Sequence, residues 1–139
     1  MAEVRIHASR VLRRRFLSDG TRRGIDGYFA ITHGERPLWW KEDTASGVLG
    51  VFENIAGSEE DALIIDSAGV TVRSSPGERL AFAEIAELVP PPKQPMATVI
   101  ECRMRDGTVR TLPVRPREGQ IMDIYRFLLS AVGEFRTRR

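Results

Sequence analysis

The sequence predicts a mainly β (α+β) domain: a bent antiparallel sheet or partly open barrel of about seven strands, closed by one C-terminal amphipathic helix and preceded by an N-terminal extension. Two observations carry this prediction. From about Val48 onward, short β-rich runs alternate with turn residues, most clearly at Asp106-Gly107, and Asp-Gly between two such runs is a strong hairpin signal. The last segment instead repeats apolar residues at the spacing of one helix face.

The expected strands follow one another along the chain and are separated by turn residues. They are Val48–Ile55, Ala62–Asp66, Val70–Ser74, Ala97–Met104 and Thr108–Val114. The turn Asp66-Ser67-Ala68-Gly69 joins two of them as a hairpin. Leu80–Val89 fits no single period, so we expect two short strands that meet at a kink, with a helix as the alternative. Pro90-Pro91-Pro92 ends this segment, because proline continues neither a sheet ladder nor a helix.

The closing helix is expected over Gln120–Val132. Pro116 suits its first turn and Gly133 suits its C-terminal cap. Five apolar residues at i, i+3, i+4, i+7 and i+11 share one face, and that face needs a sheet to cover. These residues are Ile121, Ile124, Tyr125, Leu128 and Val132.

Residues 1–46 form a basic extension, either packed on the domain of residues 47–139 or separate from it. Its first part is compatible with a short helix over Ala8–Phe16 or with a strand at Val4–His7. Tyr28–Thr32 and Leu38–Trp40 are expected to form a further hairpin around His33-Gly34-Glu35-Arg36.

Size and charge are those of one small globular protein. The chain has 139 residues, of which 42% are hydrophobic, which is enough for a core. No run approaches the ~18–20 apolar residues of a membrane-spanning helix, no secretory signal stands out, and one cysteine permits no internal disulfide. We therefore expect a cytoplasmic protein without a transmembrane segment.

The charge is distributed unevenly along the chain. Residues 1–40 carry eight arginines against four acidic residues, whereas residues 41–102 carry four basic and eleven acidic residues.

Four segments carry a resemblance to a known family: ALIIDSAGVTV, LAFAEIAELV, MRDGTVRTLPV and the helix Gln120–Val132. Together, and over residues 48–139, they resemble the bacterial pleckstrin-homology-like (PH-like) domains. The resemblance implies a strongly bent antiparallel sheet plugged at one end by a helix. Phosphoinositide-binding members carry Lys and Arg at the loop after the first strand. Here that loop, Gly57–Asp61, is acidic and would repel an inositol phosphate, so we do not expect standard phosphoinositide binding.

The residue types of catalytic and metal sites are scarce. The chain has two histidines, His7 and His33, and one cysteine, too few for a triad or a three-ligand metal site without distant carboxylates. Strand alternation places Cys102 on the core side, as an inert thiol. Glu59-Glu60-Asp61 lacks the ligand spacing of a calcium loop, and no Gly-rich phosphate loop is present. We therefore predict no enzymatic activity, no metal and no cofactor.

Two groups of residues are candidates for interaction. The first is a cluster of arginines that can contact nucleic-acid phosphates or an anionic membrane, or can simply form a solvated helix face. These are Arg10, Arg13, Arg14, Arg15, Arg22 and Arg23. The second is Trp39-Trp40. Adjacent strand residues point in opposite directions, so at most one should face the core, and the other should meet a partner or the chain's own N-terminal segment.

These features favour a non-enzymatic protein-interaction or scaffold module of PH-like type. Its partner would be another protein or a second copy of the chain, bound through the sheet surface or an open edge. The alternative is a nucleic-acid-associated or anionic-surface-binding factor that uses the arginine cluster.

Overall fold

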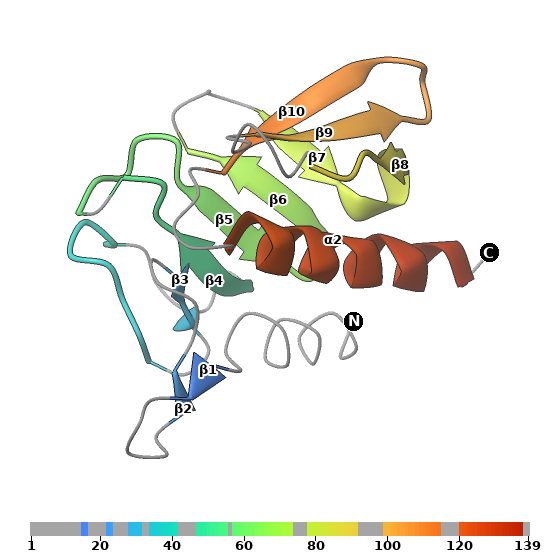
Figure 1. The fold of residues 1–139 in the computed structure, drawn as a ribbon. Helices are drawn as coiled ribbons and strands as arrows, with labels where there is room; N and C mark the ends of the chain where they lie inside the picture. Colours follow the sequence, from blue (N-terminus) through green and yellow to red (C-terminus); the bar gives the residue numbers. More distant parts are fainter. Residues whose placement is uncertain are drawn as a thin grey trace.

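A computed structural model describes residues 15–16, 22–23, 28–31, 34–41, 47–55, 57–73, 78–91, 99–114 and 120–137. In these residues the protein is mainly β, with a five-stranded and a three-stranded antiparallel sheet and one C-terminal helix (Figure 1). The two sheets do not close into a barrel. A separate short pair joins β1 (Arg15–Phe16) to β2 (Arg22–Arg23).

The larger sheet is a meander in which each strand pairs with the next one along the chain. Its strands are β3 (Tyr28–Phe29), β4 (Val48–Phe52), β5 (Leu63–Asp66), β6 (Gly69–Val72) and β7 (Arg79–Ala81). Between β5 and β6, Asp66 Oδ1 accepts the backbone N–H groups of Ala68 at 2.7 Å and Gly69 at 2.9 Å. The carboxylate therefore accepts the backbone N–H groups of its own turn, and the predicted hairpin is confirmed.

The smaller sheet has the order β10-β9-β8 and contains β8 (Ile85–Leu88), β9 (Val99–Met104) and β10 (Val109–Pro113). A single 3₁₀ turn, η4 (Phe82–Glu84), joins β7 to β8. The prediction of two short strands that meet at a kink is thus confirmed. The 3₁₀ turn shifts the side-chain period, so that Leu80, Phe82, Ile85 and Leu88 all become buried. From Val48 onward the described chain has seven strands, the number predicted.

The Asp-Gly hairpin between β9 and β10 has a three-residue loop. Gly107 N donates to Met104 O at 3.1 Å, and Met104 N donates to Thr108 O at 2.8 Å. Gly107 has a φ of +91°, which only glycine adopts readily. This pattern is a turn followed by a bulge, which sets the strand pairing that follows. Along β9, Ile100 and Cys102 are buried, as the alternation predicts.

Helix α2 (Gln120–Thr137) packs against η4 and β8. In Figure 1 it crosses the molecule below the three-stranded sheet. All five residues of the predicted apolar stripe are buried, and Phe127 joins them in a T-shaped contact with Phe82. The predicted cap at Gly133 is wrong: the helix continues through it, without the positive φ of such a cap. In the described chain, no helix is long and apolar enough to cross a membrane.

The predicted hairpin between Tyr28–Thr32 and Leu38–Trp40 is also wrong. Tyr28 and Phe29 pair with Phe52 and Val51 of β4. Residues 38–39 form a turn instead. The edge of β4 offers a longer apolar partner than the segment before Lys41 does, and Tyr28 and Ala30 join the main core there. Four described residues of the predicted extension are therefore buried in the two apolar clusters on either face of the sheet: Tyr28, Ala30, Ile31 and Trp40.

Candidate functional site

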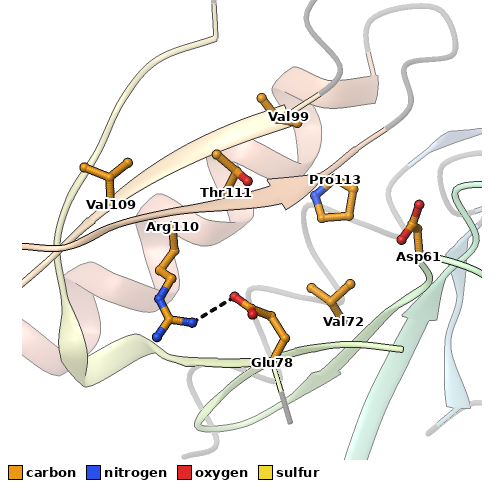
Figure 2. A pocket seen from close by; sticks show the side chains of 8 residues that line it. All are labelled: Asp61, Val72, Glu78, Val99, Val109, Arg110, Thr111 and Pro113. Carbon is orange, nitrogen blue, oxygen red and sulfur yellow. Dashed lines mark hydrogen bonds and ion pairs between the residues drawn. The ribbon is translucent and has the colours of Figure 1, made fainter. Parts of the chain in front are cut away.

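A hollow of about 390 Å³ lies between the two sheets, along the outer edge of β10. Val109, Arg110, Thr111 and Pro113 form its wall on the β10 side (Figure 2). Val72 lines it from β6, Glu78 from the position just before β7, Asp61 from the turn before β5, and Val99 from β9. The hollow is therefore built by segments that are distant in the sequence.

The edge of β10 turns a row of backbone groups toward this hollow. Because Met104 N donates to Thr108 O, the alternating antiparallel pattern turns positions 110 and 112 toward β9 and positions 109, 111 and 113 away from it. Pro113 fits its outward position because it has no N–H to satisfy. Among the described residues, none bonds the outward N–H and C=O groups of Val109 and Thr111. The edge thus has four backbone groups ready to pair.

Two polar contacts span the seam between the sheets at either end of the hollow. Arg110 Nη1 donates to Glu78 Oε1 at 3.0 Å, as Figure 2 shows by its dashed line. At the other end, Asn54 Nδ2 donates to the backbone oxygens of Pro113 at 2.8 Å and Asp61 at 2.5 Å. Asn54 is only 4% exposed, and its amide nitrogen donates to the chain on both sides of the gap between the sheets, as a buried polar group requires. These contacts connect β10 to the larger-sheet side at both ends of the hollow.

The apolar part of the hollow is solvent-accessible. Val99 and Val109 are 43% and 55% exposed, and they account for two of the four large hydrophobic residues that are exposed in the described chain. Single exposed apolar residues are normal on a protein surface, and these two lie on β9 and on its edge neighbour β10. Val72, at 4% exposure, forms an apolar floor.

Half of the predicted arginine cluster lies outside what the structure describes. Arg10, Arg13 and Arg14 are not among the described residues. The backbone of Arg15 pairs with that of Arg23, and Arg22 pairs with Phe16, in the small β1-β2 sheet. The interaction proposed for these arginines stays a prediction.

Trp39 and Trp40 lie at a second, smaller apolar cluster on the other face of the larger sheet. Trp40 is buried there with Ile31, Val51 and Ile64, and Trp39 packs against the same cluster. Their rings meet edge to face, with centroids 5.9 Å apart. The expectation that the two side chains point in opposite directions is wrong, because these residues follow a turn rather than a strand.

Polar groups hold Trp39 in place. Its Nε1 donates to Glu53 Oε2 at 2.7 Å, and the guanidinium of Arg73 lies 5.9 Å from the centre of its ring. Glu53 is 5% exposed and also accepts the N–H of Gly57 at 3.2 Å. Leu38, which precedes the pair, is 97% exposed. The tryptophans thus stabilise the turn, while Leu38 remains in solvent.

Known proteins offer no assignment for this arrangement. Comparison of the chain with protein-family models, curated proteins and solved structures finds no match. No group of three or more His, Cys, Asp or Glu residues in the described ranges is placed to hold a metal ion. Cys102 is fully buried, and that burial, together with the charge of Glu101, raises the pKa of its thiol to about 12. The prediction of an unreactive thiol on the core side agrees with this environment.

The hollow beside β10 was not among the sites predicted from the sequence. One signal for it does exist in the sequence: Pro113 interrupts the run TVRTLPV, and proline inside a strand indicates the edge of a sheet. No pattern in the sequence indicates that Asn54, Asp61 and Glu78 also lie at this site, because they come close to β10 only when the two sheets pack together.

Proposed function

We propose that this chain is a non-enzymatic protein-binding module of PH-like fold, which binds an extended segment of a partner protein as an added strand along β10. One observation carries the proposal: Val109 and Thr111 turn unpaired backbone groups toward an open hollow. In β-strand addition such groups supply the affinity, and neighbouring side-chain pockets supply the specificity. Val99, Val109 and the hollow are suited to provide that specificity, because they can contact side chains of the bound segment.

The backbone contribution alone is modest. Each protein–protein hydrogen bond is worth ~0.5–1.5 kcal/mol net, so the four outward groups together contribute on the order of 4 kcal/mol, which is no more than association costs in lost translational and rotational freedom. A stable complex therefore needs side chains of the bound segment to fill the hollow. The assay must accordingly detect weak binding and report where it occurs.

A phage-displayed library of random peptides, selected on the full chain, tests the proposal. Enriched peptides are then titrated into the isotope-labelled chain, with NMR amide shifts as the readout. We expect the largest shifts at Val109 and Thr111. Thr111→Pro removes an outward N–H that the β9–β10 ladder does not use, as Pro113 already does two positions later. It should weaken binding at least tenfold, whereas the matched variant Thr111→Ala should bind as the parent does.

Val109→Pro provides a second, independent block of the same edge in case Thr111→Pro unfolds the hairpin. Equal binding to the parent chain and to a folded proline variant, or shifts centred elsewhere, would overturn the proposal. So would a selection that enriches no peptide. Salt-dependent retention of the chain on DNA, lost when Arg13, Arg14 and Arg15 are replaced, would instead support the nucleic-acid alternative.

A further inference from the structure

The outward backbone groups of β10 match those of a second copy of the same strand. They belong to Val109 and Thr111, two positions apart, each with one N–H and one C=O. When two such strands run antiparallel with Val109 opposite Thr111, the two residues of each pair exchange both of their hydrogen bonds. We infer that the segment bound along β10 is β10 of a second copy of this chain, paired about a two-fold axis at Arg110; this inference rests on the proposed function.

Only one two-fold register uses all of these groups. A register centred on Arg110 places Val109 of each copy opposite Thr111 of the other, so that every outward N–H meets an outward C=O. Registers shifted toward the end of β10 place one of these residues opposite Pro113, which has no N–H, and a carbonyl is left without a donor. Registers shifted toward its start place Thr111 opposite Gly107, which belongs to the turn and not to the strand. The two ends of β10 thus determine where a second copy can pair.

The charged side chains that meet at the axis alternate in sign. Successive strand residues point to opposite faces, so Arg110 lies on the inner face with the buried Leu112, and Figure 2 shows it directed toward Glu78. At the axis it faces Arg110 of the second copy, with about 4.5 Å between the Cα atoms of such a pair.

Two arginines in that position repel each other, but each is already paired with its own Glu78 at 3.0 Å. That contact uses one oxygen of the carboxylate, and the other oxygen can accept from Arg110 of the second copy. Each copy therefore contributes one carboxylate and one guanidinium to a balanced group of charges.

On the outer face the same register covers apolar surface. Val109 is 55% exposed, and in the paired edge it lies beside Thr111 of the second copy. Side chains directly opposite each other on one face of antiparallel strands stabilise the pairing. The pairing also removes an open edge, because the two three-stranded sheets become one continuous sheet across the axis.

Sedimentation equilibrium of the full chain, from micromolar to millimolar concentration, tests for this dimer. We expect a reversible monomer–dimer equilibrium. Thr111→Pro removes an outward N–H from each copy and should raise the dissociation constant of the dimer by roughly tenfold or more. Thr111→Ala keeps the backbone groups and should change this constant by less than about threefold. Val109→Pro blocks the same edge independently, in case Thr111→Pro unfolds the hairpin.

Cysteine cross-linking reports the register. A disulfide needs Cα atoms about 4.4–6.8 Å apart, which directly opposite residues satisfy, whereas residues offset by two positions are about 7–8 Å apart. Arg110→Cys should therefore cross-link to itself on oxidation. Val109→Cys and Thr111→Cys should cross-link to each other when mixed and much more slowly alone. Cys102 is buried and should give no background. Faster cross-linking of Thr111→Cys alone than of the mixture would contradict the register.

Charge variants test the arrangement at the axis. Glu78→Gln leaves the two Arg110 side chains facing each other without their carboxylates and should weaken the dimer by roughly two- to fivefold. Arg110→Gln removes the repulsion and should weaken it less. Equal effects would mean that the ion pair only connects the two sheets within one copy, against the proposed arrangement. Glu87→Gln breaks an ion pair of the same length outside the hollow and should have no effect.

Dimerisation and peptide binding can fail independently. A chain that stays monomeric at millimolar concentration, but binds selected peptides at Val109 and Thr111, would overturn the dimer and leave strand addition standing. A dimer that neither proline variant weakens would have its interface elsewhere, which also overturns the inference. A monomeric chain that binds no peptide at this edge would contradict both.

Discussion

The ring of Tyr28 in β3 lies directly over Gly50 in β4, so that a Cβ on Gly50 would overlap the Tyr28 hydroxyl and ring atoms. Tyr28 pairs with Phe52, and Gly50 is the diagonal neighbour of that pair, beside an irregularity in the β4–β5 register. The glycine thus makes the space in which Tyr28, at 7% exposure, becomes part of the main core. This contact connects the N-terminal strand to the rest of the sheet.

Gly50→Ala should therefore destabilise the protein by about 1–3 kcal/mol, the usual effect of overpacking a close contact. Urea unfolding followed by tryptophan fluorescence measures this change. Gly133→Ala is a matched control, because a Cβ there meets nothing within 4 Å in the middle of α2. That change should stabilise the chain by up to about 1 kcal/mol, since alanine is the better helix former. Equal stability of both variants would contradict the packing of Tyr28 on Gly50.

The helix stripe provides a second test. Leu128 is 1% exposed, whereas its neighbour Leu129 is 46% exposed on the same helix. Leu128→Asp places a carboxylate in the core and should cost on the order of 4 kcal/mol or more, enough to unfold much of the population. Leu129→Asp changes the same residue type at the surface and should have an effect of at most about 0.5 kcal/mol. Thermal unfolding by circular dichroism compares the two, and an unchanged Tm in Leu128→Asp would refute the packing of this helix.

The turn at Asp66 should make stability depend on pH in the acidic range. Burial raises the pKa of Asp66, but hydrogen bonds from Arg79 and from the backbone N–H groups of Ala68 and Gly69 outweigh it and hold the pKa below its usual 3.8. The unfolded chain then binds more protons than the native one below about pH 5, so the contribution of Asp66 is complete above that pH and is lost as the pH falls.

Arg79→Gln removes the strongest of these favourable contacts, in which Arg79 Nη1 lies 2.6 Å from Asp66 Oδ2. The variant should lose less stability than the parent chain between about pH 5 and pH 3, because its Asp66 pKa lies closer to the unfolded value. Urea midpoints at the two pH values measure the difference. Identical pH dependence in both proteins would show that the ion pair does not affect the titration of Asp66.

Cys102 should be unreactive in the native protein. With a thiol pKa of about 12 and a fully buried side chain, almost no accessible thiolate exists at mildly alkaline pH. Iodoacetamide should leave the folded chain unmodified by mass spectrometry and should label it rapidly in urea. Glutathione in the same solution controls for reagent activity. Rapid labelling of the native chain would mean that β9 opens or that Cys102 is not buried.

Several elements could be predicted from the sequence because short-range chemistry decides them. The Asp66 carboxylate and Gly107 act within their own turns, so the two hairpins follow from a few neighbouring residues. The α2 stripe has a period that only a helix satisfies. The kink between β7 and β8 appears in the sequence as a change of period within Leu80–Val89.

Other features depended on which segments meet in space. A glycine at position 133 suits either a cap or a helix interior, and in the structure the helix continues through it to Thr137. Tyr28 pairs with β4 rather than with the nearer Leu38–Trp40 because β4 has an open edge and Gly50 makes room for the ring.

The sequence by itself determined that the chain is mainly β from Val48 onward, with a closing helix that must cover a sheet. Only the tertiary structure decided where the open edge lies and what surrounds it. Asn54 and Pro113 are 59 positions apart, and Glu78 and Arg110 are 32 apart. No local pattern encodes such contacts, because they arise from the burial of two apolar sheet faces against a common core.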